Sequence, residues 1–348
     1  MPAVVNYEAI NTKVHSILGR RLKGDDYKKL LSLTSVNEIA LYLSKNSDYG
    51  RYIASDNLNG IHRDELEKKL KMMLIYYIDK FDNYFSGEYR DFFMTFYSKY
   101  EIYDLKRLAR LIHIEGELQS LREYLVFVDY YKNINVDNII KAKSIVELIE
   151  FLNNSVYYPY LKNLLDGNKE ENLFRFEMVL DKTYFSILFK KIKKLSGIDK
   201  KAFFEVFGPI IDMINLQWIY RGKKFYNMYP DELFNYTIDG GGKLNYKSIK
   251  ELCYSKSVEE LEDRIKLTPY SFLIKGDDMQ DIYMERRMNR YIYYKLINTI
   301  RKNKRDISNV LALMQIIEFE IRDIVSITEM VRYGIELSQS NNFLIKAV

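Results

Sequence analysis

The stretch Ser35-Val-Asn-Glu38-Ile39 recurs in this chain as Ser144-Ile-Val-Glu147-Leu148 and again as Ser257-Val-Glu-Glu260-Leu261. In each copy a Ser stands three residues before a Glu, which is the capping box that satisfies backbone donors in the first turn of a helix. The copies lie about 110 residues apart, a regular period that marks an internal repeat. The sequence therefore predicts three helical units of similar construction.

Further landmarks follow each capping box in the same order. Each unit carries a Tyr and then a Glu at the head of a long amphipathic segment. The predicted equivalents are Tyr49, Tyr160 and Tyr270, followed by Glu67, Glu177 and Glu285. A later helical segment, residues 104–110, matches residues 215–221, and its third copy is placed at Glu320-Ile-Arg322. Landmarks that keep their order and period favour a triplicated module over chance similarity.

The length and composition agree with three helical lobes. The chain has 348 residues, of which 47% are hydrophobic and only five are Pro, and a unit of about 110 residues is near the commonest domain size. We predict an all-α fold with lobes at residues 1–116, 117–238 and 239–348. The helix of residues 202–220 is predicted to be broken near Gly208-Pro209, where Pro209 should kink or restart it, and the glycine cluster at residues 240–242 is interpreted as a flexible joint.

Several protein classes are disfavoured by the sequence. The longest apolar run, residues 72–78, is far shorter than the roughly 20 residues of a membrane-spanning helix. The N-terminus lacks the basic and apolar regions of a secretory signal, so we expect a cytosolic protein. One Cys and three scattered His residues do not form a metal-ligand pattern, and we expect no metal and no cofactor.

Catalytic motifs are not recognisable in the chain. Gly242-Lys243 is followed by Leu244, so the glycine cluster lacks the hydroxyl residue with which a P-loop holds magnesium. No nucleophile and His form a recognisable catalytic pattern, and carboxylates such as Glu67 recur in each unit, as residues of a scaffold would. We therefore expect a non-catalytic protein, and an enzyme is the least favoured alternative.

A helical-repeat protein that binds nucleic acid is the main alternative. Basic clusters at residues 190–194 and 301–305 are interleaved with Tyr residues that could stack on bases. However, the net charge is only +5, from 53 basic and 48 acidic side chains, and a nucleic-acid binder usually has a more one-sided charge. Both clusters also lie at the ends of predicted helices, where the helix dipole favours cations.

Basic side chains recur on the polar face of the helix at residues 104–110 and its copies. Ile102, Leu105, Leu108 and Ile112 form one apolar stripe, and the basic residues lie opposite. If three lobes turn these helices inward, the basic side chains line the wall of a cavity. An ordinary outer surface explains the pattern equally well. The residues in question are Arg107, Arg110, Arg221 and Arg322.

The chain resembles the C subunit of the bacterial and archaeal V/A-type ATPases, whose family includes the eukaryotic d subunit. The resemblance covers nearly the whole chain and depends on the order of short motifs rather than on one signature. These motifs are Tyr7-x-Ala9-x-Asn11-x-Lys13-Val14, Arg21-Leu22, Asp48-Tyr49-Gly50, Lys99-Tyr-x-x-x-Asp104-Leu-Lys, Asn215-Leu-Gln217 and Glu318-x-Glu320-Ile-Arg322-Asp-Ile324.

The resemblance implies a fold and a role. It implies an all-helical funnel of three similar lobes with pseudo-threefold symmetry and a central cavity, placed on the cytoplasmic side of the membrane as a peripheral protein. The funnel would hold the central stalk against the membrane proteolipid ring and transmit torque without chemistry of its own; nucleic acid is not an expected partner. The predicted inner-wall residues that contact the stalk are Asp104, Arg107, Arg110, Gln217, Arg221 and Arg322.

Overall fold

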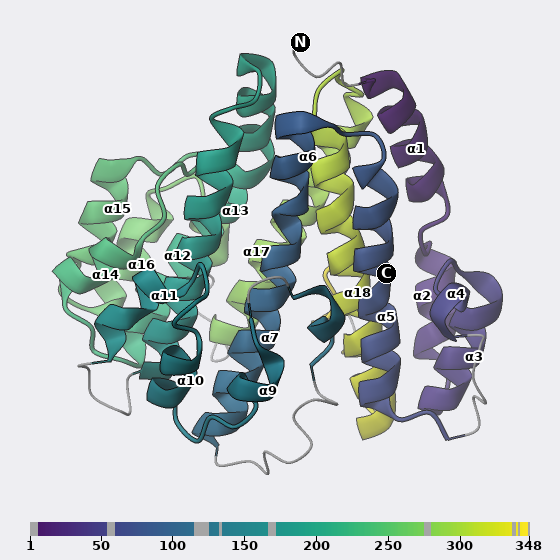
Figure 1. Ribbon diagram of the computed structural model, residues 1–348, viewed down its shortest axis with the longest axis horizontal. Helices are drawn as coiled ribbons and strands as arrows, with labels where there is room; N and C mark the ends of the chain where they lie inside the picture. Colours follow the sequence, from purple (N-terminus) through teal and green to yellow (C-terminus); the bar gives the residue numbers. More distant parts are fainter. Residues whose placement is uncertain are drawn as a thin grey trace.

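A computed structural model describes residues 6–53, 60–114, 125–131, 134–165, 172–274, 280–335, 339 and 342–346. Every regular element within these ranges is a helix, so the predicted all-α class is confirmed (Figure 1). None of the helices in the described ranges combines the length and the apolarity that crossing a membrane requires.

The helices are grouped below by the three repeats that the sequence predicts, residues 1–116, 117–238 and 239–348. The first repeat contributes α1 (Tyr7–Gly19), α2 (Gly24–Leu31), α3 (Val36–Asn46), α4 (Gly50–Ile53), α5 (Arg63–Asp82), α6 (Gly87–Met94) and α7 (Phe96–His113). The second contributes α9 (Val136–Ile139), α10 (Ile145–Phe151), α11 (Tyr158–Leu161), α12 (Asn172–Ile192), α13 (Gly197–Lys224) and α14 (Pro230–Tyr236). The third contributes α15 (Tyr246–Cys253), α16 (Val258–Lys266), α17 (Gln280–Arg301) and α18 (Ser308–Tyr333).

The three predicted capping boxes are present at the starts of α3, α10 and α16. Ser35, Ser144 and Ser257 each accept a hydrogen bond from the backbone N–H of the Glu three residues later, at 3.3, 3.1 and 3.2 Å. Each Glu side chain in turn accepts from the backbone N–H of the residue before the Ser, at 2.7 to 2.8 Å. These reciprocal bonds fix where each short helix begins.

Helix α18 forms the centre of the molecule. It packs against α17, α13, α5 and α1, and Figure 1 shows it running lengthwise beside α5. Residues 308–321 are buried on every side of this helix, including the polar Asn309. A helix buried all round is a core helix, so elements from all three repeats share one hydrophobic core.

The structure corrects the predicted interruption at Pro209. Helix α13 runs without a break from Gly197 to Lys224 and contains Pro209 in its interior. Pro removes one backbone hydrogen bond of the helix. Buried side chains on both sides of it, including Phe207 and Ile211, keep the segment packed in the core. Tertiary packing therefore outweighs the local preference of Pro.

The glycine cluster is a fixed turn and not the flexible joint that we predicted. The backbone N–H groups of Gly242 and Lys243 donate to Asp212 Oδ2 on α13, at 3.0 and 2.6 Å. A Cβ atom at Gly241 would lie 2.1 Å from Asp212 Oδ1, and one at Gly208 would lie 2.9 Å from the Cα atom of Gly242. Glycine is needed here because the turn lies directly against α13.

Candidate functional site

A buried Tyr in each repeat donates a hydrogen bond to a carboxylate on a long helix of a different repeat. All three phenol rings are at most 1% exposed. The backbone N–H of each Tyr also donates to a Ser or Thr hydroxyl two residues earlier, so the three sites share a local turn. The pairs are Tyr49 with Glu320 at 2.9 Å, Tyr157 with Glu101 at 2.6 Å and Tyr270 with Asp212 at 2.5 Å.

The second member of this set is Tyr157, whereas the sequence comparison selected Tyr160. Tyr160 is half-buried, and its hydroxyl accepts from Lys190 at 3.3 Å. The two residues are three positions apart beside α11, so sequence spacing alone could not separate them.

A second repeated contact lies three residues after each of these carboxylates. Asp104 accepts hydrogen bonds from the backbone N–H groups of Val126 and Phe127, at 3.2 and 2.8 Å. Asn215 exchanges two bonds of 2.8 Å with the backbone of Ile238.

Asp323 completes the set on α18. Its carboxylate accepts from the backbone N–H groups of Ile345 and Lys346, at 2.7 and 3.0 Å. Asp323 is therefore the third equivalent of Asp104 and Asn215, and the match to Glu320 in the sequence comparison was three residues out of register.

The assignment of Asp104 to a partner-binding wall is wrong. Its side chain is 0% exposed and also accepts a hydrogen bond from Tyr131 at 2.8 Å. Burial raises the pKa of this carboxyl above its usual range, although its hydrogen bonds act in the opposite direction. A side chain with no exposed surface cannot contact a second protein, so Asp104 stabilises the fold.

Replacing Asp323 with Asn is expected to change how stability depends on pH. Burial raises the pKa of Asp323 to about 6, whereas an unfolded Asp titrates at about 3.9. The folded state therefore binds the Asp323 proton more tightly than the unfolded state does. The stabilisation from this bound proton is largest below the unfolded pKa and is lost as the pH rises through about 6. When the pH falls from about 7.5 to about 5, the free energy of unfolding of the wild type should rise by about 1.4 kcal/mol relative to that of Asp323→Asn.

Urea unfolding of both proteins at several pH values measures this difference. Asn is a mild replacement because Asn215 already occupies the equivalent position in the second repeat. Parallel pH profiles for the two proteins would contradict the prediction.

Three of the predicted site residues lie where consecutive repeats meet. Arg110 on α7 forms an ion pair with Glu177 on α12, at 2.5 Å. Arg221 on α13 forms the corresponding pair with Glu285 on α17 at 3.4 Å, and Gln217 donates to the same carboxylate at 3.2 Å. The Arg110 and Arg221 side chains remain 61% and 41% exposed, so both are accessible to a partner.

The third seam is different, because an acidic side chain stands at the position of the two arginines. Counted from Asp323, Glu329 on α18 occupies the position of Arg110 and Arg221, and it pairs with Arg63 on α5 at 2.6 Å. Arg63 also pairs with Glu67, the equivalent of Glu177 and Glu285, at 2.8 Å. Burial raises the pKa of Glu67, but the neighbouring cations Lys71 and Arg63 have the larger, opposite effect, so the pKa lies below its usual value.

The remaining two predicted residues are not equivalent to each other. Arg107 on α7 is half-buried, and its charge acts on Glu67. Arg322 on α18 is exposed, with its guanidinium carbon 5.9 Å from the centre of the Phe319 ring. With Asp323 as the repeat position, the counterpart of Arg107 is Ser326, so the basic face is not repeated in the third copy.

A buried arginine that the site prediction did not select joins the first and third repeats. Arg21 donates to Glu320 at 3.2 Å, to Asp48 at 2.9 Å and to the Tyr77 hydroxyl at 3.0 Å. The backbone N–H of Leu22 also donates to Glu320, at 2.9 Å. The motif Arg21-Leu22 was visible in the sequence, but only its distant partners reveal its role.

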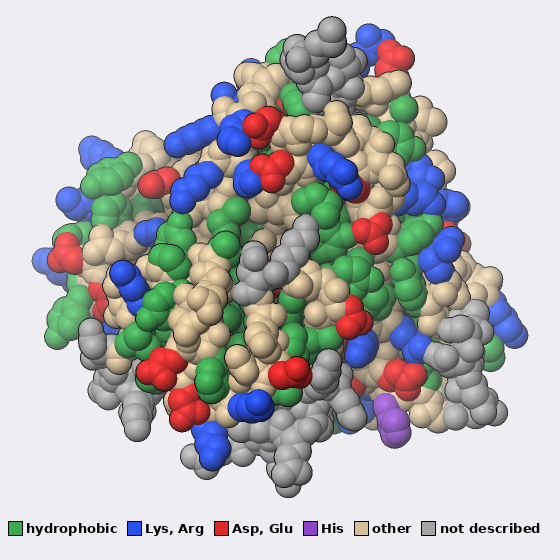
Figure 2. All heavy atoms as spheres, in the orientation of Figure 1, with side chains coloured by type: hydrophobic (Ala, Val, Ile, Leu, Met, Phe, Trp, Pro, Cys, Tyr) green, Lys and Arg blue, Asp and Glu red, His purple; other side chains and the backbone are tan. Residues whose placement is uncertain are grey.

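Half of the basic residues behind the nucleic-acid alternative form ion pairs with carboxylates. Figure 2 shows acidic and basic side chains interspersed on the face that it presents. Ion pairing leaves less positive charge available for a phosphate backbone. The pairs are Lys191 with Asp91, Lys194 with Glu88, Lys304 with Glu205 and Arg305 with Glu8.

Among the residues with a described placement, no group of three His, Cys, Asp or Glu side chains is arranged as a metal-ligand set. The buried polar groups of the repeated contacts pair with one another or with the backbone. This arrangement can join helices of different repeats rigidly.

This chain is similar in sequence to known proteins along most of its length. The sequence profile of the family described as ATP synthase (C/AC39) subunit matches residues 10–343. The C subunit of the A-type ATP synthase of Methanosarcina mazei is 27% identical over 286 residues, which cover 82% of this chain and 78% of that protein. The proteins of the same name from Methanosphaera stadtmanae and Methanocaldococcus jannaschii are 24% and 21% identical, covering 91% and 92% of this chain and 82% of each relative.

Proposed function

Because the chain belongs to the ATP synthase (C/AC39) subunit family, we propose that it is the non-catalytic rotor component that connects the central stalk of a V/A-type ATPase to the membrane proteolipid ring. In this role it transmits torque between ATP hydrolysis or synthesis in the head and ion movement through the ring. It is then a peripheral protein on the cytoplasmic side of the membrane. The match of the family profile over residues 10–343 is the observation that carries the proposal.

The proposed shape is a funnel of three lobes, residues 1–116, 117–238 and 239–348, around a pseudo-threefold axis. The three Tyr–carboxylate pairs support it. Tyr157 connects the second lobe to the first, Tyr270 connects the third to the second, and Tyr49 connects the first to the third. Like contacts that return to their starting point are the pattern of a closed cyclic arrangement.

The proposed rigidity follows from the same contacts. A rotor component that passes torque must resist twisting between its lobes, and buried, fully paired polar groups hold their neighbours in one arrangement. The shared hydrophobic core adds close packing, which has low compressibility. Lobes joined in this way would turn together with the stalk.

The proposed contacts to the stalk are made by the predicted side chains that reach the surface. These are Arg107, Arg110, Gln217, Arg221 and Arg322, whereas Asp104 is excluded by its burial. Arg110 and Arg221 are the best supported pair, because they occupy equivalent positions at two seams and remain accessible while ion-paired.

Reversing both charges is expected to release the stalk without unfolding the protein. In a tagged chain purified from gently solubilised native membranes, the wild type should bring down both the proteolipid ring and the stalk proteins. Arg110→Glu with Arg221→Glu should retain the ring but recover at least about tenfold less stalk, because like charges placed across an interface cost several kcal/mol. The melting temperature should change little, since exposed ion pairs contribute only about 0–1 kcal/mol each.

A matched control replaces two other exposed, ion-paired arginines. Arg90 pairs with Asp82 and Arg264 with Glu260, and Arg90→Glu with Arg264→Glu makes the same change in net charge. Equal loss of stalk in both double variants would exclude Arg110 and Arg221 as the contact. A wild-type chain that accompanied neither the ring nor the stalk would overturn the proposed function itself.

A further inference from the structure

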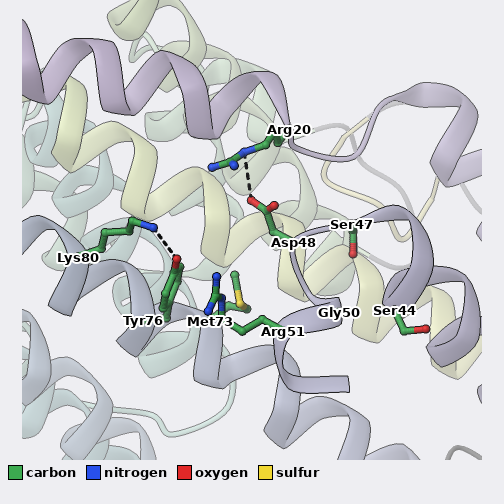
Figure 3. Close-up of a pocket in the computed structure, with 9 residues that line it drawn as sticks. All are labelled: Arg20, Ser44, Ser47, Asp48, Gly50, Arg51, Met73, Tyr76 and Lys80. Atoms are coloured by element: carbon green, nitrogen blue, oxygen red, sulfur yellow. Dashed lines mark hydrogen bonds and ion pairs between the residues drawn. The ribbon is translucent and has the colours of Figure 1, made fainter. Parts of the chain in front are cut away.

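A pocket of about 560 Å³ opens on the first repeat, between the end of α1, the α3–α4 turn and α5 (Figure 3). Its lining includes the cations Arg20, Arg51 and Lys80. Figure 3 shows their nitrogen-bearing ends approaching one another from three separate elements. None of the repeated contacts between helices uses this pocket, and the proposed coupling role does not require it.

The positive charge of the pocket exceeds its negative charge. Among the described residues, Asp48 is the one carboxylate in the lining, and it is shared by Arg20 at 3.5 Å and by the buried Arg21 at 2.9 Å. Within the described ranges, Arg51 and Lys80 form no ion pair with a carboxylate. Their nearest polar or aromatic partner is Tyr76, which accepts a hydrogen bond from Lys80 at 2.5 Å and has the Arg51 guanidinium 4.5 Å from its ring centre.

A further cation, Lys13, lies near the lining residues Lys80 and Arg20. Lys13 on α1 is half-buried; its pKa is lowered by burial and then by the charges of Lys80 and Arg20, so these three side chains lie close together. Burial raises the pKa of Tyr76, but the hydrogen bond and the charge of Lys80, with Arg51 and Lys13, bring it below its usual value. The lining therefore carries three cations and one shared carboxylate, with Lys13 close by, an arrangement that an anion would stabilise.

We propose that this pocket binds a phosphate-bearing anion. Arg presents a planar fork of donors that matches phosphate oxygens, and Lys adds a compact charge with three donors. The three cations enter from different elements and could surround a phosphate group on several sides. The volume also has room for more than one phosphate group. The anion is either a free phosphoanhydride or phosphate ester or the headgroup of an anionic lipid, since both present the same oxygens.

Titration of the full-length chain with inorganic pyrophosphate in low-salt buffer, followed by calorimetry, tests the proposal. The wild type should bind one equivalent, and the affinity should fall as salt screens the charges. Arg51→Gln with Lys80→Gln should weaken binding by about tenfold or more, because each substitution removes a charge-assisted hydrogen-bond donor. The control Lys193→Gln with Lys256→Gln removes the same charge from exposed sites on other repeats and should leave the affinity unchanged.

A second arm separates the two sources of phosphate. Vesicles of phosphatidylcholine with and without phosphatidylglycerol are sedimented with each variant. Retention on the anionic vesicles that is lost in Arg51→Gln with Lys80→Gln identifies a lipid headgroup, whereas binding of pyrophosphate without retention identifies a soluble anion. The absence of both kinds of binding in the wild type, or an equal loss in the control variant, would overturn the proposal. Melting curves of all variants verify that they are folded.

Discussion

Replacing Arg21 with Ala is expected to lower the free energy of unfolding by about 3 to 5 kcal/mol, because the substitution leaves a buried carboxylate without its cation. The Arg21 side chain is only 5% exposed, and it connects Glu320 on α18 with Asp48 beside α3. Glu320 is almost completely buried, and burial raises its pKa, which shows that its surroundings oppose the charge. Without Arg21, this charge keeps hydrogen bonds from Tyr49 and from the backbone of Leu22, and the more distant charge of Lys346.

The neighbouring Arg20 provides a matched control. It also pairs with Asp48, at 3.5 Å, but its side chain is 52% exposed. Arg20→Ala should therefore cost no more than about 1 kcal/mol, as exposed ion pairs do. Urea unfolding followed by circular dichroism measures both variants under the same conditions. Equal stabilities for Arg20→Ala and Arg21→Ala would show that the contact between the first and third repeats does not depend on the buried pair.

Replacing Asp212 with Ala should destabilise the fold by about 3 kcal/mol, because several buried donors lose their common acceptor. Its carboxylate accepts from the backbone N–H groups of Gly242 and Lys243 and from the Tyr270 hydroxyl. The same substitution removes the contact that joins Tyr270 to α13. The amide protons of Gly242 and Lys243 should then exchange with solvent faster than in the wild type, which hydrogen exchange would detect.

Two further variants make this result specific. Asp212→Asn keeps one acceptor oxygen and should cost less than the alanine substitution. Asp239→Ala alters an exposed carboxylate three residues before Gly242 and should change stability by no more than about 0.5 kcal/mol. If Asp239→Ala were as damaging as Asp212→Ala, the turn would owe its conformation to the loop sequence rather than to α13.

The capping boxes show what the sequence predicts well. Ser35 and Glu38 interact within one turn of chain, so their spacing alone determines the contact. The positions of α3, α10 and α16 followed directly from this local chemistry. The same holds for the all-α class, which depends on helical periodicity within each segment.

The register of the third repeat could not be predicted in the same way. Residues three apart on a helix lie on the same face, so a slip from Asp323 to Glu320 preserves both the polarity and the apolar stripe. Only the backbone segment that each side chain binds distinguishes them, and for Asp323 that segment is at Ile345 and Lys346. The slip also hid Glu329, because an acidic residue at this position does not match the Arg of the other two copies.

The burial of charged residues was the other limit of the prediction. Asp104 and Arg21 are charged residue types that are usually exposed. Each is buried by partners from another part of the chain, Val126 and Phe127 for Asp104 and Glu320 for Arg21. The solvent exposure of Asp104 and Arg21 therefore depends on contacts with distant parts of the chain, which a local sequence pattern does not reveal.

The acidic residue at the third seam sets that seam apart from the other two. If the second repeat took the place of the third beside the first, Arg221 would stand at the position of Glu329. Arg63 would then lose its partner Glu329 and would compete with Arg221 for Glu67. A triplicated sequence allows such exchanges of equivalent parts, and this difference in charge favours the arrangement in which the third repeat closes against the first.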